Sequence, residues 1–319
     1  MKSPFNIMPG TVIRGKWNKK EYTVIRELGR GANGIVYLAD RNGKKVAVKM
    51  SDQSVNISSE TNVLKSFQKA RGVSLGPSLL DIDDWTYGSR QMSFYVMEYI
   101  RGWDLLTFIK RKGKNWLPVL ILQLLSDLDN LHRQGWVFGD LKPENLIVTD
   151  MPVKVRCIDF GGATLQGRAV KEFTEFYDRG YWGLGSRKAE PSYDLFAVAM
   201  IIIHVFCLDR FEKKEGGIGQ LKSVIEQKEG LQRYQPVLLK ALKGRYTRAE
   251  EMRKDLLKIV YPKTTSLTMT DRTGIRTPKS RIARNKDRRK GRTYGMLETL
   301  VILFIICMIY ALYIFEQLL

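Results

Sequence analysis

The first third of the chain alternates apolar and polar residues between glycines, and this pattern predicts a small antiparallel sheet. The segments EYTVIREL, GIVYLAD, KKVAVKM and SFYVMEYI, between about residues 10 and 99, follow the two-residue period of half-buried strands. One helical segment, SSETNVLKSFQKA at 58–70, interrupts them and carries serines and Glu60 where a helix is expected to begin.

The pattern then changes to the helical period. The segments PVLILQLLSDLDNLHRQG, SYDLFAVAMIIIHVFC and AEEMRKDLLKIV predict helices, and NLIVTD and VKVRCIDF predict strands between the first two. We therefore expect an α+β, bilobal domain over residues 11–262, with a small β-rich lobe at about 11–99 and a larger helical lobe at about 100–262. The length of 319 residues and an apolar content of 44% exclude a fibrous or low-complexity protein.

The pattern changes again after Pro262. Residues 263–295 lack an apolar period and predict a disordered basic linker. Residues 299–315 carry no charge, are rich in Ile, Leu and Val, and lie between Glu298 and Glu316, so a transmembrane helix is expected at 296–316. A buried core helix is the alternative, but no later segment could cover its other faces.

Charge sets the expected orientation of this span. The chain has a net charge of +20, and residues 263–293 hold eleven Lys or Arg against two Asp, a net charge of +9. Basic residues beside a membrane span stay on the cytoplasmic side, so we expect a single-pass protein of the cell membrane with a cytoplasmic catalytic domain and the C-terminus outside. The N-terminus has no apolar run typical of a signal peptide, and the three cysteines lack metal-ligand spacing.

A glycine-rich turn follows the first of the predicted strands. Gly29, Gly31 and Gly34 form the pattern G-x-G-x-x-G, in which backbone amides can approach phosphate oxygens. It lies between two strands, whereas a dinucleotide-binding turn leads from a strand into a helix. Lys49 follows on the next apolar strand, and Glu60 on the next helix could hold it across a phosphate-binding cleft.

The segment FGDLKPENL at 138–146 carries the groups that phosphoryl transfer requires. Asp140 could orient a hydroxyl, Lys142 could lie near the transferred phosphate, and Asn145 could bind magnesium. Asp159, in DFG at the end of the second predicted strand, offers another oxygen ligand for Mg²⁺. Each role occurs once, in order and in a fitting context.

These motifs resemble those of the eukaryotic-like, or Hanks-type, protein kinases over about residues 11–262. The resemblance implies ATP and Mg²⁺ as cofactors, protein substrates, and serine/threonine specificity because Lys142 follows Asp140 by two residues. It also implies that Asp194 braces the catalytic loop and that RYTRAEEM at 245–252 belongs to the closing helix. By the same resemblance, the ATP-binding residues are Gly29, Gly31, Gly34, Val36, Ala47, Lys49, Glu60, Met97, Glu98 and Tyr99, the catalytic residues Asp140 and Lys142, and the metal ligands Asn145 and Asp159.

The sequence departs from the family pattern at two places in this domain. Phe138 and Gly139 replace the usual His-Arg before Asp140, so the arginine that docks an activation-loop phosphate is absent. Arg179-Gly180-Tyr181 replaces Ala-Pro-Glu, which removes the glutamate expected to pair with an arginine such as Arg245. These changes leave the activation mechanism and the substrate platform open.

The basic linker permits three interpretations: a topology determinant, a surface for anionic lipid, or a sequence-independent DNA contact. The length, the segment WVFGDLKPENLIV, the linker and the terminal anchor resemble sporulation-associated, membrane-anchored kinases of spore-forming bacteria, and this resemblance implies association with DNA. We hypothesise that a polyanion gathers kinases on the membrane and promotes phosphorylation in trans. The residues expected to contact DNA or another polyanion are Lys279, Arg281, Arg284, Lys286, Arg288, Arg289, Lys290 and Arg292.

Two other functions remain open from the sequence. Phe-Gly-Asp is similar to the His-Gly-Asp loops of small-molecule kinases that act on antibiotics or lipid-linked sugars, although Lys142 and Asp194 argue against that function. A catalytically dead scaffold that holds DNA at a membrane is the other alternative. It should have lost Lys49, Asp140 or Asp159, and all three are present.

Overall fold

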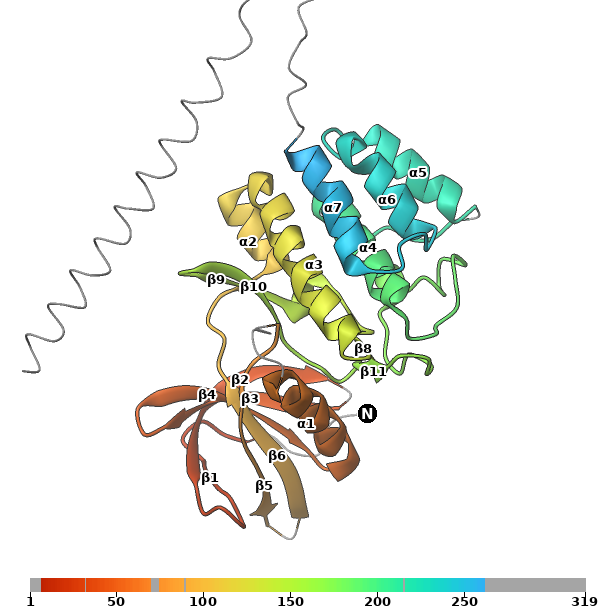
Figure 1. Cartoon of the computed structure of the whole chain (residues 1–319). Helices are drawn as coiled ribbons and strands as arrows, with labels where there is room; N and C mark the ends of the chain where they lie inside the picture. Colours follow the sequence, from red (N-terminus) through yellow and green to blue (C-terminus); the bar gives the residue numbers. More distant parts are fainter. Residues whose placement is uncertain (1–6, 32, 70–74, 89, 215, 262–319) are drawn as a thin grey trace, which may run out of the picture. The chain divides into compact units, whose positions relative to one another are not determined.

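The computed structural model describes residues 7–261 except 32, 70–74, 89 and 215. In this part of the chain an antiparallel sheet is followed by a mainly helical lobe (Figure 1). The predicted linker at 263–295, with its eight expected polyanion contacts, and the predicted span at 296–316 lie outside the described residues. No helix within the described residues is long and apolar enough to cross a membrane.

The N-terminal lobe is a six-stranded sheet in the order β1-β2-β3-β4-β6-β5, with all neighbouring strands antiparallel. The glycine-rich turn joins the second and third strands, because the short β1 precedes the strands that the pattern predicted. Helix α1 begins at Ser54, before the predicted start, and packs against β4, β5 and β6. The bounds are β1 Val12–Arg14, β2 Glu21–Gly31, β3 Gly34–Arg41, β4 Lys44–Ser51, α1 Ser54–Lys69, β5 Leu79–Tyr87 and β6 Arg90–Glu98.

Alternation along these strands builds the core of the lobe. One buried cluster of the lobe contains Tyr22, Val24, Tyr37 and Phe94. Along β2, buried Tyr22 and Val24 alternate with exposed residues. Ile7 also packs in this core, and its backbone N–H donates to the Tyr37 hydroxyl. The core of the lobe therefore includes a residue that precedes the expected domain start at residue 11.

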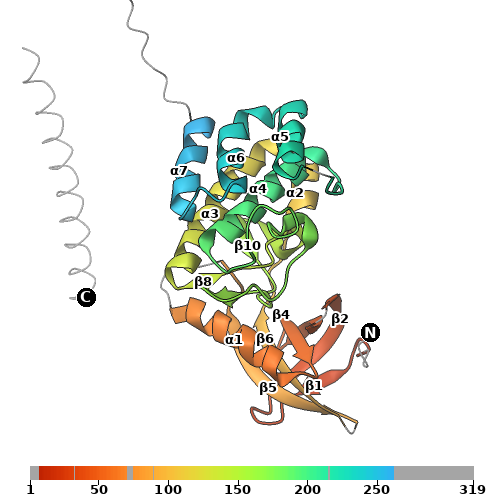
Figure 2. The ribbon, with the colours of Figure 1, turned by 90° about the vertical axis from the view of Figure 1, so that its right-hand side faces the viewer.

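The C-terminal lobe is organised around α3 and α4, which Figure 2 shows with α5, α6 and α7 beside them. Its helices are α2 Leu105–Lys112, α3 Leu117–Arg133, α4 Pro191–Cys207, α5 Ile218–Gln227, α6 Gln235–Leu242 and α7 Ala249–Val260. Its short strands are β7 Trp103–Asp104, β8 Trp136–Val137, β9 Leu146–Asp150, β10 Val153–Cys157 and β11 Thr164–Leu165. Helix α7 has the bounds of the predicted segment AEEMRKDLLKIV, and of the RYTRAEEM segment only Ala249–Met252 lies in it.

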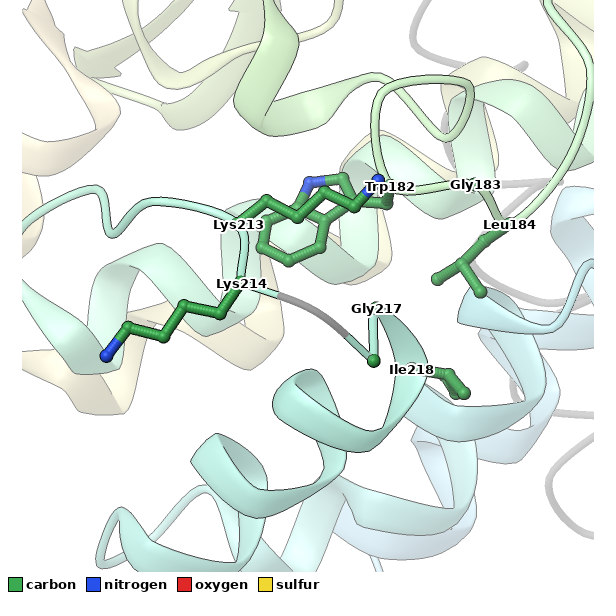
Figure 3. Close-up of a pocket in the computed structure, with 8 residues that line it drawn as sticks. Trp182, Gly183, Leu184, Lys213, Lys214, Gly217 and Ile218 are labelled. Carbon is green, nitrogen blue, oxygen red and sulfur yellow. The ribbon is translucent and has the colours of Figure 1, made fainter.

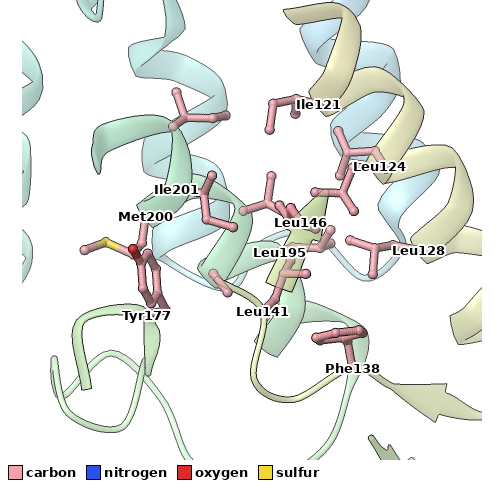
Figure 4. Packing of buried hydrophobic residues seen from close by; sticks show 14 of the residues in the cluster. Ile121, Leu124, Leu128, Phe138, Leu141, Leu146, Tyr177, Leu195, Met200 and Ile201 are labelled. Atoms are coloured by element: carbon pink, nitrogen blue, oxygen red, sulfur yellow. The ribbon is translucent and has the colours of Figure 1, made fainter. Parts of the chain in front are cut away.

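Helix α4 is apolar on nearly all sides, which is typical of a helix surrounded by protein. Leu124 and Leu128 of α3 and Leu195 of α4 belong to one buried cluster that also contains Phe138 and Leu141 of the catalytic loop (Figure 4). Packing of this cluster fixes the loop between two helices. The two lobes then place their polar residues at the cleft between them.

Candidate active site

The glycine-rich turn leaves room above the cleft. A Cβ atom added to Gly29 or Gly31 would meet no atom within 4 Å, so the backbone is open to a ligand at these positions. Gly34 is constrained differently, because its φ is +136° and an added Cβ would lie 2.1 Å from the Met50 carbonyl oxygen. The first two glycines therefore provide access, and the third allows the turn to form.

The residues expected around adenine lie on adjacent strands. Ala47 on β4 is the register partner of Met97 on β6, and both are buried. Val36 on β3 is the partner of Lys49, and Tyr99 follows the end of β6. The Glu98 carboxylate is engaged elsewhere: it pairs with Arg156 at 2.9 Å and accepts the Ser78 N–H at 3.1 Å, so it holds the segment that links the lobes.

Lys49 and Glu60 form the ion pair that their order in the sequence suggested. Lys49 Nζ lies 2.8 and 2.7 Å from the two Glu60 carboxylate oxygens and 2.9 Å from Asp159 Oδ1. The Tyr95 hydroxyl donates to Glu60 Oε2 at 2.7 Å. Lys49 and Glu60 are only 4% and 2% exposed, so these contacts replace water around buried charges.

The charges of this group affect one another's protonation. Burial is the largest influence on Lys49 and disfavours its ammonium, but Asp159 and Glu60 together outweigh it and raise the pKa of Lys49. Burial also raises the pKa of the Glu60 carboxyl despite the Lys49 contact. For Asp159, burial acts upward, but Lys49 and the Gly161 N–H lower its pKa below the ordinary value. Lys49 is thus a charged group that faces two carboxylates.

Asp194 holds the catalytic loop in place from α4. Its carboxylate is completely buried and accepts the backbone N–H groups of Phe138 at 2.8 Å and Gly139 at 3.0 Å. His132 Nε2 lies 2.8 Å from the same carboxylate. These contacts fix the backbone immediately before Asp140, as the family resemblance implied.

Asp140 and Lys142 meet at the centre of the site. Lys142 Nζ is 2.5 Å from Asp140 Oδ2, and the Thr174 hydroxyl donates to Asp140 Oδ1 at 2.9 Å. Lys142 also donates to the Thr174 oxygen at 3.2 Å. A carboxylate with a hydroxyl already at hydrogen-bond distance can orient an attacking hydroxyl and accept its proton.

Asn145 and Asp159 are brought together by backbone pairing. Asn145 Nδ2 donates to the Asp140 carbonyl at 2.9 Å, and the Asn145 carbonyl accepts the Ile158 N–H at 2.8 Å. Asp159 adopts a left-handed backbone conformation with φ of +62°, and its side chain is 51% exposed. Mg²⁺ prefers oxygen ligands and is usually bound by one or two protein groups together with phosphate and water, so the oxygens of Asn145 and Asp159 fit this ion. Among the described residues no group of three or more His, Cys, Asp or Glu could hold a metal.

The two departures from the family pattern have structural counterparts. Gly139 stands where the docking arginine is missing; its φ is +84°, and an added Cβ would lie 2.5 Å from the Gly162 carbonyl oxygen. In place of the lost glutamate, Arg179 pairs with Glu190 at 2.7 Å and Asp178 pairs with Arg187 at 2.7 Å. Arg245 is exposed, so the substrate side of the site uses ion pairs of its own.

A contact above the site also joins the two lobes. Asn33, in the glycine-rich turn, donates to the Glu172 carboxylate, and Asn56 of α1 donates to the Asn33 side-chain oxygen at 3.3 Å.

A separate cavity of about 610 Å³ lies between residues 182–184 and the segment leading into α5 (Figure 3). None of the predicted site residues lines it, so it is not part of the catalytic cleft.

Comparisons with known proteins identify the family. The model of the protein kinase domain matches residues 22–278. The chain belongs to the protein kinase family. It is 57% identical over 254 residues to the serine/threonine-protein kinase YabT of Bacillus subtilis, a match that covers 79% of this chain and 75% of the relative.

The names of more distant relatives also describe protein kinases. The sporulation protein kinase mde3 of Schizosaccharomyces pombe is 27% identical over 64% of this chain and 41% of its own length. Human serine/threonine-protein kinase greatwall is 28% identical over 44% of this chain and 16% of its own length. The chain is therefore a serine/threonine protein kinase, and the family implies ATP and typically Mg²⁺. The protein-kinase interpretation is confirmed over the small-molecule kinase and the inactive scaffold.

Sequence reasoning missed four residues that shape the site. Tyr95 reads as an ordinary aromatic residue of a buried strand, and Thr174 is one of many threonines. Asp178 and Arg187 occupy a segment without a recognisable motif. Only the spacing of Thr174 before the altered Ala-Pro-Glu position could have singled out one of them.

Proposed function

We propose that the cleft transfers the γ-phosphoryl group of ATP to serine or threonine with the residues assigned from the motifs. Lys49, held by Glu60, binds the ATP phosphates beneath Gly29 and Gly31, and Ala47 and Met97 contact the adenine. Asn145 and Asp159 would hold Mg²⁺, which would neutralise charge on the phosphates. The observation that carries this assignment is the contact between Asp140, Lys142 and the Thr174 hydroxyl, because it places a carboxylate, a cation and a hydroxyl together.

In this assignment each residue has one task. Asp140 orients the substrate hydroxyl and accepts its proton as the oxygen attacks phosphorus. Lys142 lies near the transferred group and offsets its negative charge. Because Asp194 fixes the backbone before Asp140, the carboxylate needs no large reorganisation when a substrate enters.

We further propose that the basic stretch from Lys279 to Arg292 binds DNA without sequence preference and that this binding raises kinase activity. What supports the proposal is its charge: residues 263–293 carry a net charge of +9, and such a segment neutralises backbone phosphates with strong salt dependence. The proposal includes a single membrane span at 296–316, a cytoplasmic catalytic domain with the C-terminus outside, self-association for phosphorylation in trans, and a role in sporulation.

The test compares three full-length forms in detergent or vesicles. The first is unchanged, the second has the eight basic residues from Lys279 to Arg292 replaced by Gln, and the third has residues 279–292 scrambled at constant composition. We expect duplex DNA of unrelated sequences to increase phosphorylation of a generic protein by the first and third forms, and this increase should vanish at about 0.5 M salt.

The control ligand is a vesicle that contains phosphatidylglycerol, because anionic lipid would use the same charges. Activation by these vesicles alone would replace DNA with lipid as the partner. An equal DNA response from the Gln form would refute regulation through the stretch, while leaving the kinase assignment intact. Resistance of the full chain to carbonate extraction from membranes, compared with a chain ending at Pro262, tests the span.

A further inference from the structure

Arg187 contacts the activation segment, residues 159–190, at three separate points. Its backbone carbonyl accepts the Val170 N–H at 2.8 Å. Its guanidinium lies 3.9 Å from the centre of the Phe173 ring, a cation–π contact. The same guanidinium donates from Nε to Asp178 Oδ2 at 2.8 Å and lies 2.7 Å from that oxygen through Nη2.

The three contacts enclose the residue that touches the catalytic aspartate. Thr174 follows Phe173 directly and precedes a short 3₁₀ turn, Glu175–Tyr177, that ends at Asp178. The Thr174 hydroxyl bonds to Asp140 and lies 3.2 Å from Lys142 Nζ. Arg187 therefore holds the chain on both sides of the one threonine that reaches the reaction centre among the described residues.

Asp178 anchors this turn to the helical core. Its side chain is completely buried and accepts the Tyr193 hydroxyl at 2.9 Å and the N–H groups of Gly180 and Tyr181 at 3.0 and 2.9 Å. Tyr193 is followed in α4 by Asp194, which holds the catalytic loop. Two consecutive residues of one helix thus fix the substrate-side turn and the catalytic loop relative to each other.

A backbone ladder supports the start of the segment. The Gly167 N–H donates to the Ala189 carbonyl at 2.8 Å, and the Ala189 N–H donates to the Arg168 carbonyl at 2.7 Å. Val170 is buried in a small cluster with Val137, Ala189 and Tyr193. An added Cβ on Gly139 would lie 3.4 Å from a Val170 methyl group, so apolar packing occupies the space beside the position of the missing arginine.

We propose that Arg187 is a positioning residue that orders the activation segment through Asp178 and Phe173, so that this kinase does not need a phosphate on that segment. An arginine usually captures a segment phosphate in such enzymes, whereas here the arginine belongs to the segment and its anionic partner is the built-in carboxylate of Asp178. The inference rests on the kinase activity of the family and not on DNA binding. In this proposal Thr174 is held in position by amino-acid side chains and not by a phosphate that must first be added.

The first test measures the kinetics of the full-length chain with Arg187→Ala, Arg187→Lys and a matched control, Arg168→Ala. Arg168 lies in the same segment, is exposed, and its side chain makes no hydrogen bond or ion pair with the described residues. We expect Arg187→Ala to lower kcat by about tenfold or more while KM for ATP changes by less than about twofold, because only the substrate side loses its geometry. Arg187→Lys should recover part of kcat, and Arg168→Ala should stay within about twofold of the unchanged chain.

The second test removes phosphate. The unchanged chain is treated with a protein phosphatase, checked by intact mass, and assayed over its first turnovers. Its initial rate should stay within about twofold of the untreated rate, because Asp178 supplies the anion. A fall of about tenfold would overturn the inference, as would an Arg187→Ala variant with unchanged kcat.

Folding of the variants is checked by the binding of a fluorescent ATP analogue. If Arg187→Ala fails to bind the analogue, Phe173→Leu provides the decisive variant, since it removes the ring beneath the guanidinium and leaves the Asp178 pair in place. Phe173 is 39% exposed and outside the core clusters. It should lower kcat by a few-fold at unchanged KM for ATP, and an unchanged kcat in this variant would refute the positioning role.

Discussion

The ATP side and the substrate side of the cleft are built in different ways. On the ATP side, Lys49 and Glu60 are buried, and each charge depends on one or two other side chains. On the substrate side, Arg187 and Glu190 are 43% and 42% exposed, and their partners are also held by backbone N–H groups or other contacts. When an ion-pair partner is lost on the substrate side, the buried Arg179 or Asp178 keeps several other hydrogen bonds. When Glu60 is lost on the ATP side, Lys49 keeps a single carboxylate partner, Asp159.

This difference explains which side a sequence can reveal. Buried charges at a reaction centre tolerate few substitutions in physical terms, so their order along the chain forms a recognisable pattern. Partly exposed pairs can be exchanged for other pairs that fix the same backbone. The substrate side of this kinase has lost the family's glutamate but keeps an ordered segment through Asp178, Arg187, Arg179 and Glu190.

The largest effect is expected at Asp140, where the two sides meet. Asp140→Asn removes the group that accepts the hydroxyl proton, and kcat should fall by about 10²- to 10⁴-fold. ATP affinity should stay nearly the same because Lys49, Glu60 and Asp159 are unchanged. Initial rates with a generic protein substrate, together with binding of an ATP analogue, measure both quantities.

Asp150→Asn is the matched control, since Asp150 is an exposed carboxylate at the end of β9. It should leave both quantities unchanged. If the Asp140→Asn variant kept the original kcat, Asp140 would have no role in catalysis. The two sides of the cleft would then not meet at this residue.

The sequence predicted the positions that local spacing controls. Lys49 and Glu60, eleven residues apart, were expected to pair, and the structure places them within 2.8 Å. The long amphipathic or apolar segments gave α3, α4 and α7 nearly at their observed bounds. Short elements such as α5 and α6 were not predicted individually, because eight to ten residues contain too few turns for a clear period.

The remaining parts of the site depend on folding of the whole domain. Tyr95 reaches Glu60 only because β6 lies next to β4 and α1 covers both strands. Asp178 meets Tyr193 because the intervening chain turns back onto α4. Helix α1 was placed too late because Ser58 and Ser59 offered a start signal, whereas packing against the sheet extends the helix back to Ser54.

A second prediction compares the same substitution on both sides. Glu60→Gln leaves the buried Lys49 with one carboxylate partner, Asp159. The free energy of unfolding should therefore fall by about 2–3 kcal/mol, which is somewhat less than the loss expected when a buried charge loses its sole partner. KM for ATP should rise by about tenfold, because Lys49 is no longer held at the phosphates. Denaturant unfolding and ATP-dependent rates measure these changes.

Glu190→Gln serves as the comparison on the substrate side. Its carboxylate contacts Arg179 and Ser192. The buried Arg179 keeps its hydrogen bonds to the Ser186 and Lys188 carbonyls and to the Ser192 hydroxyl, so the loss of unfolding free energy should be about 1 kcal/mol. Equal losses for the two variants would contradict the proposed difference between the sides.

The smallest effect concerns the pH dependence of the Glu190 pair. The hydrogen bond from Arg179 is the main cause that lowers the pKa of Glu190 below its ordinary value of 4.5. A lowered carboxyl pKa stabilises the folded state above the unfolded pKa, and this contribution is lost as pH falls through the folded pKa. The difference in melting temperature between the unchanged chain and Glu190→Gln should therefore be full at pH 6 and should shrink as the pH falls below about 4.5.

Glu229→Gln provides the control for this last prediction, because Glu229 is exposed and its side chain makes no hydrogen bond or ion pair with the described residues. Its melting temperature should follow that of the unchanged chain at each pH. A difference for Glu190→Gln that stayed constant down to pH of about 3 would mean that the Glu190 contribution comes from packing and not from its charge. In that case the ion pairs of Arg179 and Arg187 would contribute less to the stability of the substrate side than their contacts indicate. The contrast between the two sides would then rest on the effect of Glu60→Gln alone.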